Sequence, residues 1–244
     1  MQEATITIKN IDKSYEEGKQ VLFDISLSIN KGEIFGMLGP SGCGKTTLVK
    51  IIDGILPASG GKVEVLGEPM PQLAMLKRIG YMAQGDALYG VMTAKENLEF
   101  FGELYGLKGK HLQERIEACL KVVDLQDKGD MTVDKYSGGM KRRLSLAATL
   151  LHEPEILILD EPTVGIDPLL RQKIWVQLKK LSEQGITIVM TTHVMDEAEK
   201  CDRLAMMRNG RLLAVDTPAK LVEMTNSTNI EEAFIKYGGA EIND

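Results

Sequence analysis

The run YSGGMKRRLSLAATLLHEPEILILDEP at residues 136–162 is the most informative stretch of this chain, because it places Ser-Gly-Gly one helix length before an apolar segment that ends in Asp-Glu. Ser137, Gly138 and Gly139 open a predicted helix. A hydroxyl, accessible backbone N–H groups and the positive end of the helix dipole together form an anion site there. A second glycine-rich loop lies upstream, so the sequence predicts two phosphate sites.

The upstream loop, GPSGCGKTT at residues 39–47, matches the pattern G-x-x-x-x-G-K-[ST] between an apolar strand pattern and a helical one, which is the context that a phosphate loop requires. Its glycines let backbone N–H groups face phosphate oxygens, while the Lys45 ammonium reaches the β- and γ-phosphates. Thr46 is expected to hold Mg²⁺ through its hydroxyl. The loop residues expected to contact the nucleotide are Gly39, Pro40, Ser41, Gly42, Cys43, Gly44, Lys45, Thr46 and Thr47.

Three polar side chains come at the ends of predicted buried strands. Asp160 ends ILILD, where its carboxylate can hold the magnesium shell, and Glu161 is the better general base because it is not tied to the metal. His193 ends ITIVMTTH, and the carboxyl ends of parallel strands meet at one edge of a sheet. A contact with the γ-phosphate is therefore favoured for His193 over a simple polar cap.

The wider pattern indicates an α/β fold. Residues 4–35 alternate apolar and polar side chains in two stretches, which is typical of a half-buried antiparallel hairpin. Residues from about 85 to 150 show helical spacing, and buried strands then alternate with helices, which predicts a parallel sheet with right-handed crossovers. Asn209-Gly210 predicts a tight hairpin turn near the end. One discontinuous domain with a helical insertion is the simplest account.

Composition narrows the function classes. The 244 residues carry a formal net charge of -6, so the chain has no overall positive field and nucleic acid is not an expected partner. Cys43, Cys119 and Cys201 lack C-x-x-C spacing, which favours a reducing compartment over a disulfide frame or a zinc site. No secretory signal is expected, and the apolar runs are far shorter than the roughly 20 residues of a membrane span. If the protein works at a membrane, it docks on a protein already there.

The order of these motifs resembles the nucleotide-binding subunit of ATP-binding cassette (ABC) transporters. The resemblance runs from about residue 3 to residue 220. It takes in the phosphate loop, Gln84 in YMAQ, YSGGM, ILILDEP, GIDP and His193. This combination of motifs is far more specific than a phosphate loop alone.

The resemblance implies a fold and an assembly. The expected fold is a P-loop NTPase core with a mixed or parallel sheet, an N-terminal antiparallel β subdomain, and a helical subdomain at residues 85–150 inserted in the core. Residues 221–244 are then a short C-terminal helix and tail. Two subunits are expected to dimerise head to tail, so that Ser137, Gly138 and Gly139 act on ATP bound to the partner.

The resemblance also assigns roles by position. Tyr15 is similar to the aromatic residue that stacks on adenine. Gln84 is similar to the residue that touches the metal or the water and reports nucleotide state to the helical subdomain. Asp167 in GIDP resembles the carboxylate of the loop that crosses the dimer interface, and His193 resembles the switch residue that contacts the γ-phosphate.

The chain departs from the family pattern at two places. Tyr136 and Met140 stand where the family usually has Leu and Gln around Ser-Gly-Gly, so the anion donors remain but any contact of the Gln side chain is absent. Gly165 and Ile166 replace the usual Ala-Leu before Asp167. The runs SGGMKRRLSLA and GIDP are most similar to the exporter branch, which moves drugs, antibiotics, lipids or polysaccharides through a separately encoded permease.

The expected function is an ATPase that closes as a dimer around two Mg-ATP, hydrolyses them with Glu161 and reopens, so that an attached permease moves. The dimer is either two copies of this chain or a pair with a relative, and it is expected at the cytoplasmic face of the cell membrane, held through the permease. The rivals are a soluble ABC-type ATPase acting on nucleic acid or ribosomes, a GTP switch protein, and a regulatory cassette that does not turn over.

Two features disfavour the first two rivals. The chain has a single cassette, and no N-K-x-D guanine motif follows the phosphate loop. The basic run at residues 141–143 could suggest nucleic acid, but three basic residues in the first turns of a helix are expected to form a solvated face.

Overall fold

The computed structural model describes residues 4–15, 18–85 and 87–239. The chain divides into two compact units. The first consists of the residues up to Leu73 together with those from Thr187 onward, and the second is Ala74–Ile186. Among the described residues, no helix is both long and apolar enough to cross a membrane.

An antiparallel sheet forms one part of the first unit. Its strands, in the order β2-β1-β4-β5, are β2 (Gln20–Asn30), β1 (Ala4–Ser14), β4 (Gly60–Val65) and β5 (Glu68–Pro69). Ile6 and Ile8 of β1 are buried, as are Ile25 and Ile29 of β2, because alternate side chains of a strand face the same side. The predicted hairpin of alternating strands is confirmed.

A mixed sheet forms the other part of this unit. Its strands, in the order β10-β9-β3-β8, are β10 (Arg211–Asp216), β9 (Arg203–Arg208), β3 (Ile34–Leu38) and β8 (Thr187–Thr192). β3 lies parallel to β8 and β9, and every residue of β3 and β8 is buried, as continuous apolar runs predict. Asn209 and Gly210 have φ of 49° and 74° in the turn that joins antiparallel β9 and β10, which confirms the predicted hairpin.

The helices of the first unit are α1 (Lys45–Asp53), α6 (Met195–Ala198), α7 (Pro218–Met224) and α8 (Ile230–Tyr237). Thr217 and Asn229 cap α7 and α8 with their side chains, so the sequence sets where these helices begin. The last three helices share one buried cluster with β3 and β9: Leu38, Ala198, Leu204, Met206, Leu221, Ile230 and Ala233. The C-terminal helices are therefore packed into the core of this unit.

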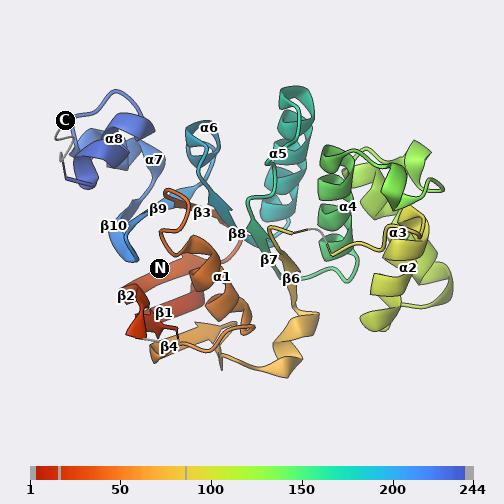
Figure 1. Cartoon of the computed structure of the whole chain (residues 1–244), viewed down its shortest axis with the longest axis horizontal. Coiled ribbons are helices and arrows are strands. Elements are labelled where there is room, and N and C mark those ends of the chain that lie inside the picture. The colour runs from red at the N-terminus through yellow and green to blue at the C-terminus, as the bar shows by residue number, and fades with distance from the viewer. Residues whose placement is uncertain (1–3, 16–17, 86, 240–244) are drawn as a thin grey trace. The chain divides into compact units, whose positions relative to one another are not determined.

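The second unit is mainly helical. Its elements are β6 (Ile79–Met82), α2 (Ala94–Leu104), α3 (Gly109–Val122), α4 (Gly138–Leu150), β7 (Ile156–Asp160) and α5 (Pro168–Glu183), with short 3₁₀ turns η2 (Leu73–Lys77), η3 (Gln126–Lys128) and η4 (Val133–Lys135). Figure 1 shows α2, α3 and α4, in yellow and green, packed on one another. β6 and β7 pair in parallel. The predicted α/β class, with an antiparallel sheet, a mixed sheet and helices, is confirmed.

Candidate nucleotide site

The phosphate loop joins β3 to α1, and its backbone depends on glycine. Gly42 and Gly44 have φ of 80° and 105°, a left-handed conformation that residues with a side chain rarely adopt. A Cβ atom on Gly39 would lie 2.3 Å from the carbonyl oxygen of Met207. Because α1 begins at Lys45, the backbone N–H groups of its first turn lie next to this loop.

Lys45 is held inside the loop. Its side chain is 5% exposed, and its ammonium donates to the carbonyl oxygens of Gly39 at 2.6 Å and Pro40 at 3.1 Å. Cys43 is buried beside it, and burial raises the pKa of this thiol even though the charge of Lys45 lowers it. Burial therefore disfavours the reactive thiolate form of Cys43.

Tyr15 lies beside the first turn of α1. Its hydroxyl is 3.4 Å from the Oγ1 atom of Thr47, and the Lys13 ammonium lies 5.3 Å from the centre of its ring. Tyr15 is nevertheless 45% exposed, which leaves an aromatic surface available next to the phosphate loop. Thr46 is half-buried on the same turn.

His193 follows β8 at the edge where the phosphate loop begins. Thr192 of β8 pairs with Leu38 of β3, and each strand continues directly into its functional segment, His193 in one case and Gly39 in the other. The imidazole is exposed. The fold thus brings His193 and the phosphate loop to neighbouring strand ends, as the parallel-sheet reasoning predicted.

In the second unit, Gln84 and Glu161 come together. Met82 of β6 pairs with Leu159 of β7, and both side chains lie two residues beyond this pair. The Gln84 amide donates to Oε2 of Glu161 at 3.2 Å. Asp160, the last residue of β7, is completely buried. Glu161 has a φ of 52°, so its backbone is in the left-handed region that non-glycine residues adopt only where their surroundings hold them.

Arg142 contacts both of these strand ends, and sequence reasoning missed it. It is 5% exposed and donates to the carbonyl oxygens of Ala83, Gln84, Asp160 and Glu161. The expectation that residues 141–143 form a solvated face is therefore wrong for Arg142. The position of Arg142 along α4 indicates burial, because Arg142 lies one turn before the buried Leu146. The charge of its side chain, in contrast, suggested exposure.

The Ser-Gly-Gly segment begins α4 at an exposed turn. The Ser137 hydroxyl caps the helix by accepting from the Met140 N–H at 3.3 Å, and both Ser137 and Gly138 are exposed. A Cβ atom on Gly138 would meet no described atom within 4 Å. Tyr136, in contrast, is 5% exposed and its hydroxyl donates to the Lys128 carbonyl oxygen at 2.8 Å. The unusual tyrosine is thus a packing residue that leaves the anion donors uncovered.

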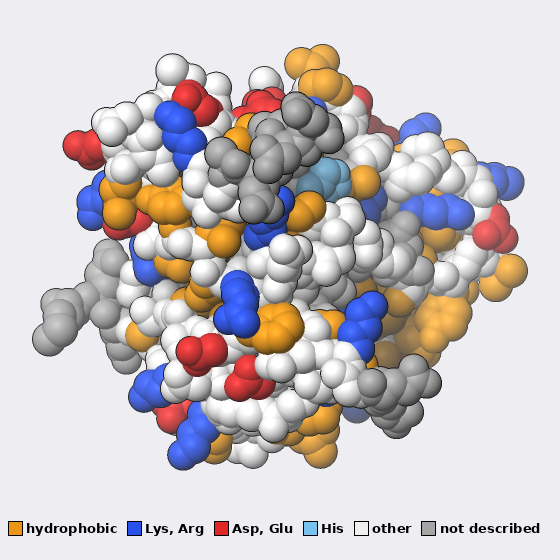
Figure 2. All heavy atoms as spheres, turned by 60° about the vertical axis from the view of Figure 1, so that its left-hand side comes forward, with side chains coloured by type: hydrophobic (Ala, Val, Ile, Leu, Met, Phe, Trp, Pro, Cys, Tyr) orange, Lys and Arg blue, Asp and Glu red, His pale blue; other side chains and the backbone are white. Residues whose placement is uncertain are grey.

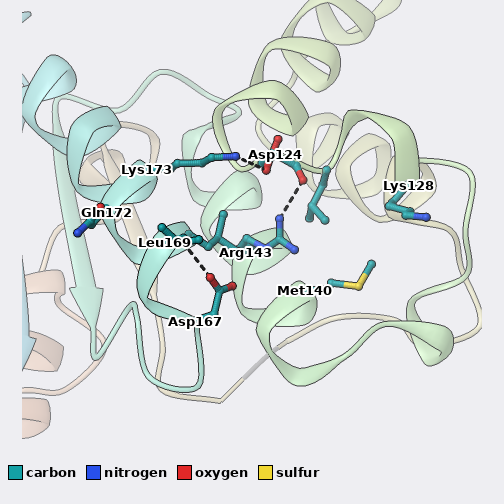
Figure 3. Close-up of a pocket in the computed structure, with 10 residues that line it drawn as sticks. Asp124, Lys128, Met140, Arg143, Asp167, Leu169, Gln172 and Lys173 are labelled. Carbon is teal, nitrogen blue, oxygen red and sulfur yellow. Dashed lines mark hydrogen bonds and ion pairs between the residues drawn. The ribbon is translucent and has the colours of Figure 1, made fainter.

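Asp167 and Met140, the other residues that the family pattern singled out, line one pocket of about 590 Å³ (Figure 3). Asp167 caps α5 by accepting from the Leu170 N–H at 3.0 Å. On the opposite side the Lys173 ammonium contacts Asp124 at 3.0 Å, which lowers the pKa of that carboxyl. The Met140 side chain, where the family usually has Gln, therefore contributes an apolar wall to this pocket.

The predicted residues thus fall into two groups. Tyr15, the loop at residues 39–47 and His193 belong to the first unit. Gln84, the segment at residues 137–139, Asp160, Glu161 and Asp167 belong to the second.

Known proteins identify the family. The family model described as ABC transporter matches residues 22–164, more than half of the chain. The chain belongs to the ABC transporter family. Nod factor export ATP-binding protein I of Sinorhizobium fredii is 42% identical to this ABC protein over 97% of the chain and 69% of its own length. The probable multidrug ABC transporter ATP-binding protein YbhF of Escherichia coli is 40% identical over 87% of the chain, which spans only 38% of YbhF.

Solved structures of this family agree with the fold. The ABC chain matches an ATP-binding subunit of an ABC transporter with a TM-score of 0.87 and 24% identity, over 96% of this chain and 99% of that one. It matches the dimeric cassette MJ0796, in a post-hydrolysis state bound to ADP and Pi, with a TM-score of 0.81 and 29% identity, over 87% and 98% of the two chains. The predicted family and ATPase class are confirmed, and the named relatives include an export and a probable multidrug protein, consistent with the exporter branch.

Proposed function

We propose that this chain is the ATP-hydrolysing subunit of a transporter, that two such subunits dimerise head to tail around two Mg-ATP, and that closure of the dimer drives a separately encoded membrane permease. The observation that carries the proposal is the hydrogen bond between Gln84 and Glu161 at the ends of two parallel strands. A carboxylate held by an amide, directly after the buried Asp160, suits a base that orients an attacking water.

The residues proposed to bind the nucleotide phosphates belong to the first unit. The loop at residues 39–47 binds the phosphates through its backbone N–H groups, and Lys45 supplies the positive charge. Tyr15 stacks on the adenine with its exposed ring, and His193 contacts the γ-phosphate from the neighbouring strand end. Pre-positioned charge of this kind supplies most of the catalysis in phosphoryl transfer.

The three residues proposed to hold a magnesium ion have suitable donor chemistry. Thr46 offers a hydroxyl, Asp160 a carboxylate and Gln84 an amide oxygen, and Mg²⁺ prefers such oxygen ligands, in small number, together with phosphate oxygens. When bound, the ion would neutralise charge on the β- and γ-phosphates. Glu161 then orients the water, because Asp160 rather than Glu161 is committed to the metal.

The dimer is supported by the exposed start of α4. An anion site lies at the N-terminal end of α4, at Ser137, Gly138 and Gly139. In the proposed dimer these residues bind the γ-phosphate of ATP held by the partner subunit. Asp167, which begins α5, lies in the loop that crosses the interface. The partner is a second copy of this chain or a related subunit.

The remaining features follow from the family. The proposed nucleotide-binding domain spans residues 3–220 with a helical subdomain at 85–150. The segment after residue 220, expected as one short helix and a tail, contains the end of α7 and the whole of α8, and both helices pack into the core of the first unit. The permease holds the subunit at the cytoplasmic face of the membrane, and the named export and multidrug relatives support an exporter.

A role on nucleic acid or ribosomes is the alternative, and the charge distribution opposes it. The net charge is -6. On the face drawn in Figure 2, the Lys and Arg side chains that are coloured lie scattered among acidic and apolar ones. The described side chains on this face form no continuous basic stripe of the kind that holds a phosphate backbone (Figure 2).

Turnover with purified protein tests the proposed function. We expect Mg²⁺-dependent hydrolysis of ATP, with loss of activity when EDTA removes the metal, and stimulation by membrane vesicles that contain the partner permease. Hydrolysis of GTP in preference to ATP, or stimulation by RNA or DNA instead of the permease, would contradict it.

A further inference from the structure

One guanidinium joins three segments of the second unit. Arg142 comes from the second turn of α4. Its Nη1 donates to the carbonyl oxygens of Ala83 at 2.6 Å and Gln84 at 3.0 Å. Its Nη2 donates to the carbonyl oxygens of Asp160 and Glu161, the latter at 2.8 Å. The segments that follow β6 and β7 are thus tied to the same helix by one side chain.

Arginine suits this position for two reasons. Its planar guanidinium presents five N–H donors in a fixed fork, so two nitrogens can serve two pairs of carbonyl groups at once. The four carbonyl oxygens also satisfy a side chain that is only 5% exposed. Lysine has a single nitrogen on a flexible stem, so it cannot hold both pairs in the same geometry.

The backbone of Glu161 shows that this arrangement is enforced. Successive residues of an extended strand point their carbonyl groups in opposite directions, whereas those of Asp160 and Glu161, at the end of β7, both accept from Arg142. The left-handed conformation of Glu161, with φ of 52°, accompanies this. Since such a conformation persists only where its surroundings hold it, the Arg142 contacts are among the interactions that fix the Glu161 backbone.

We propose that Arg142 is a positioning residue that aligns Gln84 and Glu161 for hydrolysis and makes their alignment depend on the position of α4. This inference rests on the proposed function, in which Glu161 is the base. Ser137 caps the same helix fewer than two turns before Arg142. A phosphate that binds at the start of α4 therefore fixes the position of the helical segment that carries the Arg142 guanidinium. Through Arg142, binding at the shared site then affects the position of the Glu161 carboxylate, which orients the water.

A matched control lies at the other end of α4. Arg115, on α3, donates to the carbonyl oxygens of Leu150 at 2.6 Å and Leu151 at 3.1 Å. It makes the same kind of contact as Arg142, from guanidinium to backbone carbonyl, in the same unit. Its acceptors, however, belong to the C-terminal end of α4 and not to the segments of Gln84 and Glu161. A purely structural loss should therefore affect both arginines alike.

The experiment compares Arg142→Lys with Arg115→Lys in the full chain, with kcat and KM for ATP and the thermal unfolding midpoint measured for both. For Arg142→Lys we expect kcat to fall by about tenfold to a hundredfold while KM stays within about threefold, because the loss is one of alignment and not of nucleotide binding. Arg115→Lys should lower the unfolding midpoint while kcat stays within about twofold of the parent protein.

A second readout separates positioning from folding. In the double variant that combines Glu161→Gln with Arg142→Lys, the ATP-dependent dimer should still form, which light scattering measures. If Arg142→Lys does not fold, Arg142→Gln, which retains two amide donors, is tested in the same way.

The outcomes are distinct. Equal kcat for Arg142→Lys and the parent, equal losses of kcat in the two arginine variants, or loss of the ATP-dependent dimer together with kcat would each overturn the inference. A parent protein that does not hydrolyse ATP would overturn the proposed function itself.

Discussion

Asp53, the last residue of α1, should make folding stability depend on pH. Its side chain is 4% exposed, and burial raises the pKa of this carboxyl from its ordinary value of 3.8 to about 6. The folded protein therefore binds the proton more tightly than the unfolded chain does. The contribution to stability is fully present below the unfolded pKa and is lost as pH rises through the folded pKa, so the relevant window runs from about pH 4 to about pH 6.

The magnitude follows from the size of this shift. A difference of about 2 pKa units, at about 1.4 kcal/mol each, amounts to a cost of about 3 kcal/mol once the buried carboxyl is ionised at neutral pH. Asp53→Asn removes the charge with little change in shape. The variant should exceed the parent in free energy of unfolding by up to about 3 kcal/mol at about pH 7.5 and by only about 1 kcal/mol at about pH 4.5.

Urea unfolding at these two pH values, followed by circular dichroism, measures the difference. Glu64→Gln is the control, because Glu64 is an exposed carboxyl on β4 of the same unit and its replacement should change stability by less than about 0.5 kcal/mol. An Asp53→Asn protein that is no more stable than the parent at the higher pH would refute the reasoning, and so would a gain of the same size at both pH values.

Three further substitutions test separate parts of the structure. Gly61→Ala should lower the free energy of unfolding by at least about 2 kcal/mol in urea titrations, because Gly61 has a φ of 84° and a Cβ atom would lie 2.2 Å from the Asn10 carbonyl oxygen; unchanged stability would contradict this. Lys45→Ala should weaken ATP binding by at least about tenfold in equilibrium titrations, since it removes the buried ammonium of the phosphate loop; an unchanged Kd would refute that role. Ser137→Ala should cost about 1 kcal/mol of stability, because it removes the cap of α4. It should also weaken the ATP-dependent dimer, measured by light scattering, while the ATP affinity of the monomer stays unchanged. A dimer of undiminished stability would argue against the shared site.

Local sequence patterns predicted much of the fold, because each pattern depends on residues that are close together in the chain. Alternating residues defined the β1–β2 hairpin, continuous apolar runs defined β3 and β8, and Asn209-Gly210 defined the β9–β10 turn. The strand-end rule also predicted that His193 and the phosphate loop share one edge of a parallel sheet, whereas the direct pairing of β3 with β8 is seen only in the structure. The hairpins and the buried strands themselves depend on residue type and spacing alone.

The side-chain network behind Gln84 and Glu161 was not predictable in the same way. Arg142 contacts carbonyl groups that are 18 to 59 positions away in the chain, and carbonyl groups carry no residue-specific signal. Charge argued for exposure of Arg142, whereas its register on α4 argued for burial, and only the tertiary structure decides between them. The same holds for Tyr136, whose hydroxyl finds its acceptor in the turn at Lys128.

The most direct test of the central claim is the behaviour of Glu161→Gln. This change keeps the size of the side chain but removes the base, so the variant should bind Mg-ATP, accumulate as a closed dimer and turn over ATP at least about a hundredfold more slowly than the parent. Light scattering with and without ATP, alongside a phosphate-release assay, measures both properties on one sample. A variant that hydrolyses ATP at the rate of the parent, or that stays monomeric at saturating ATP, would contradict the account.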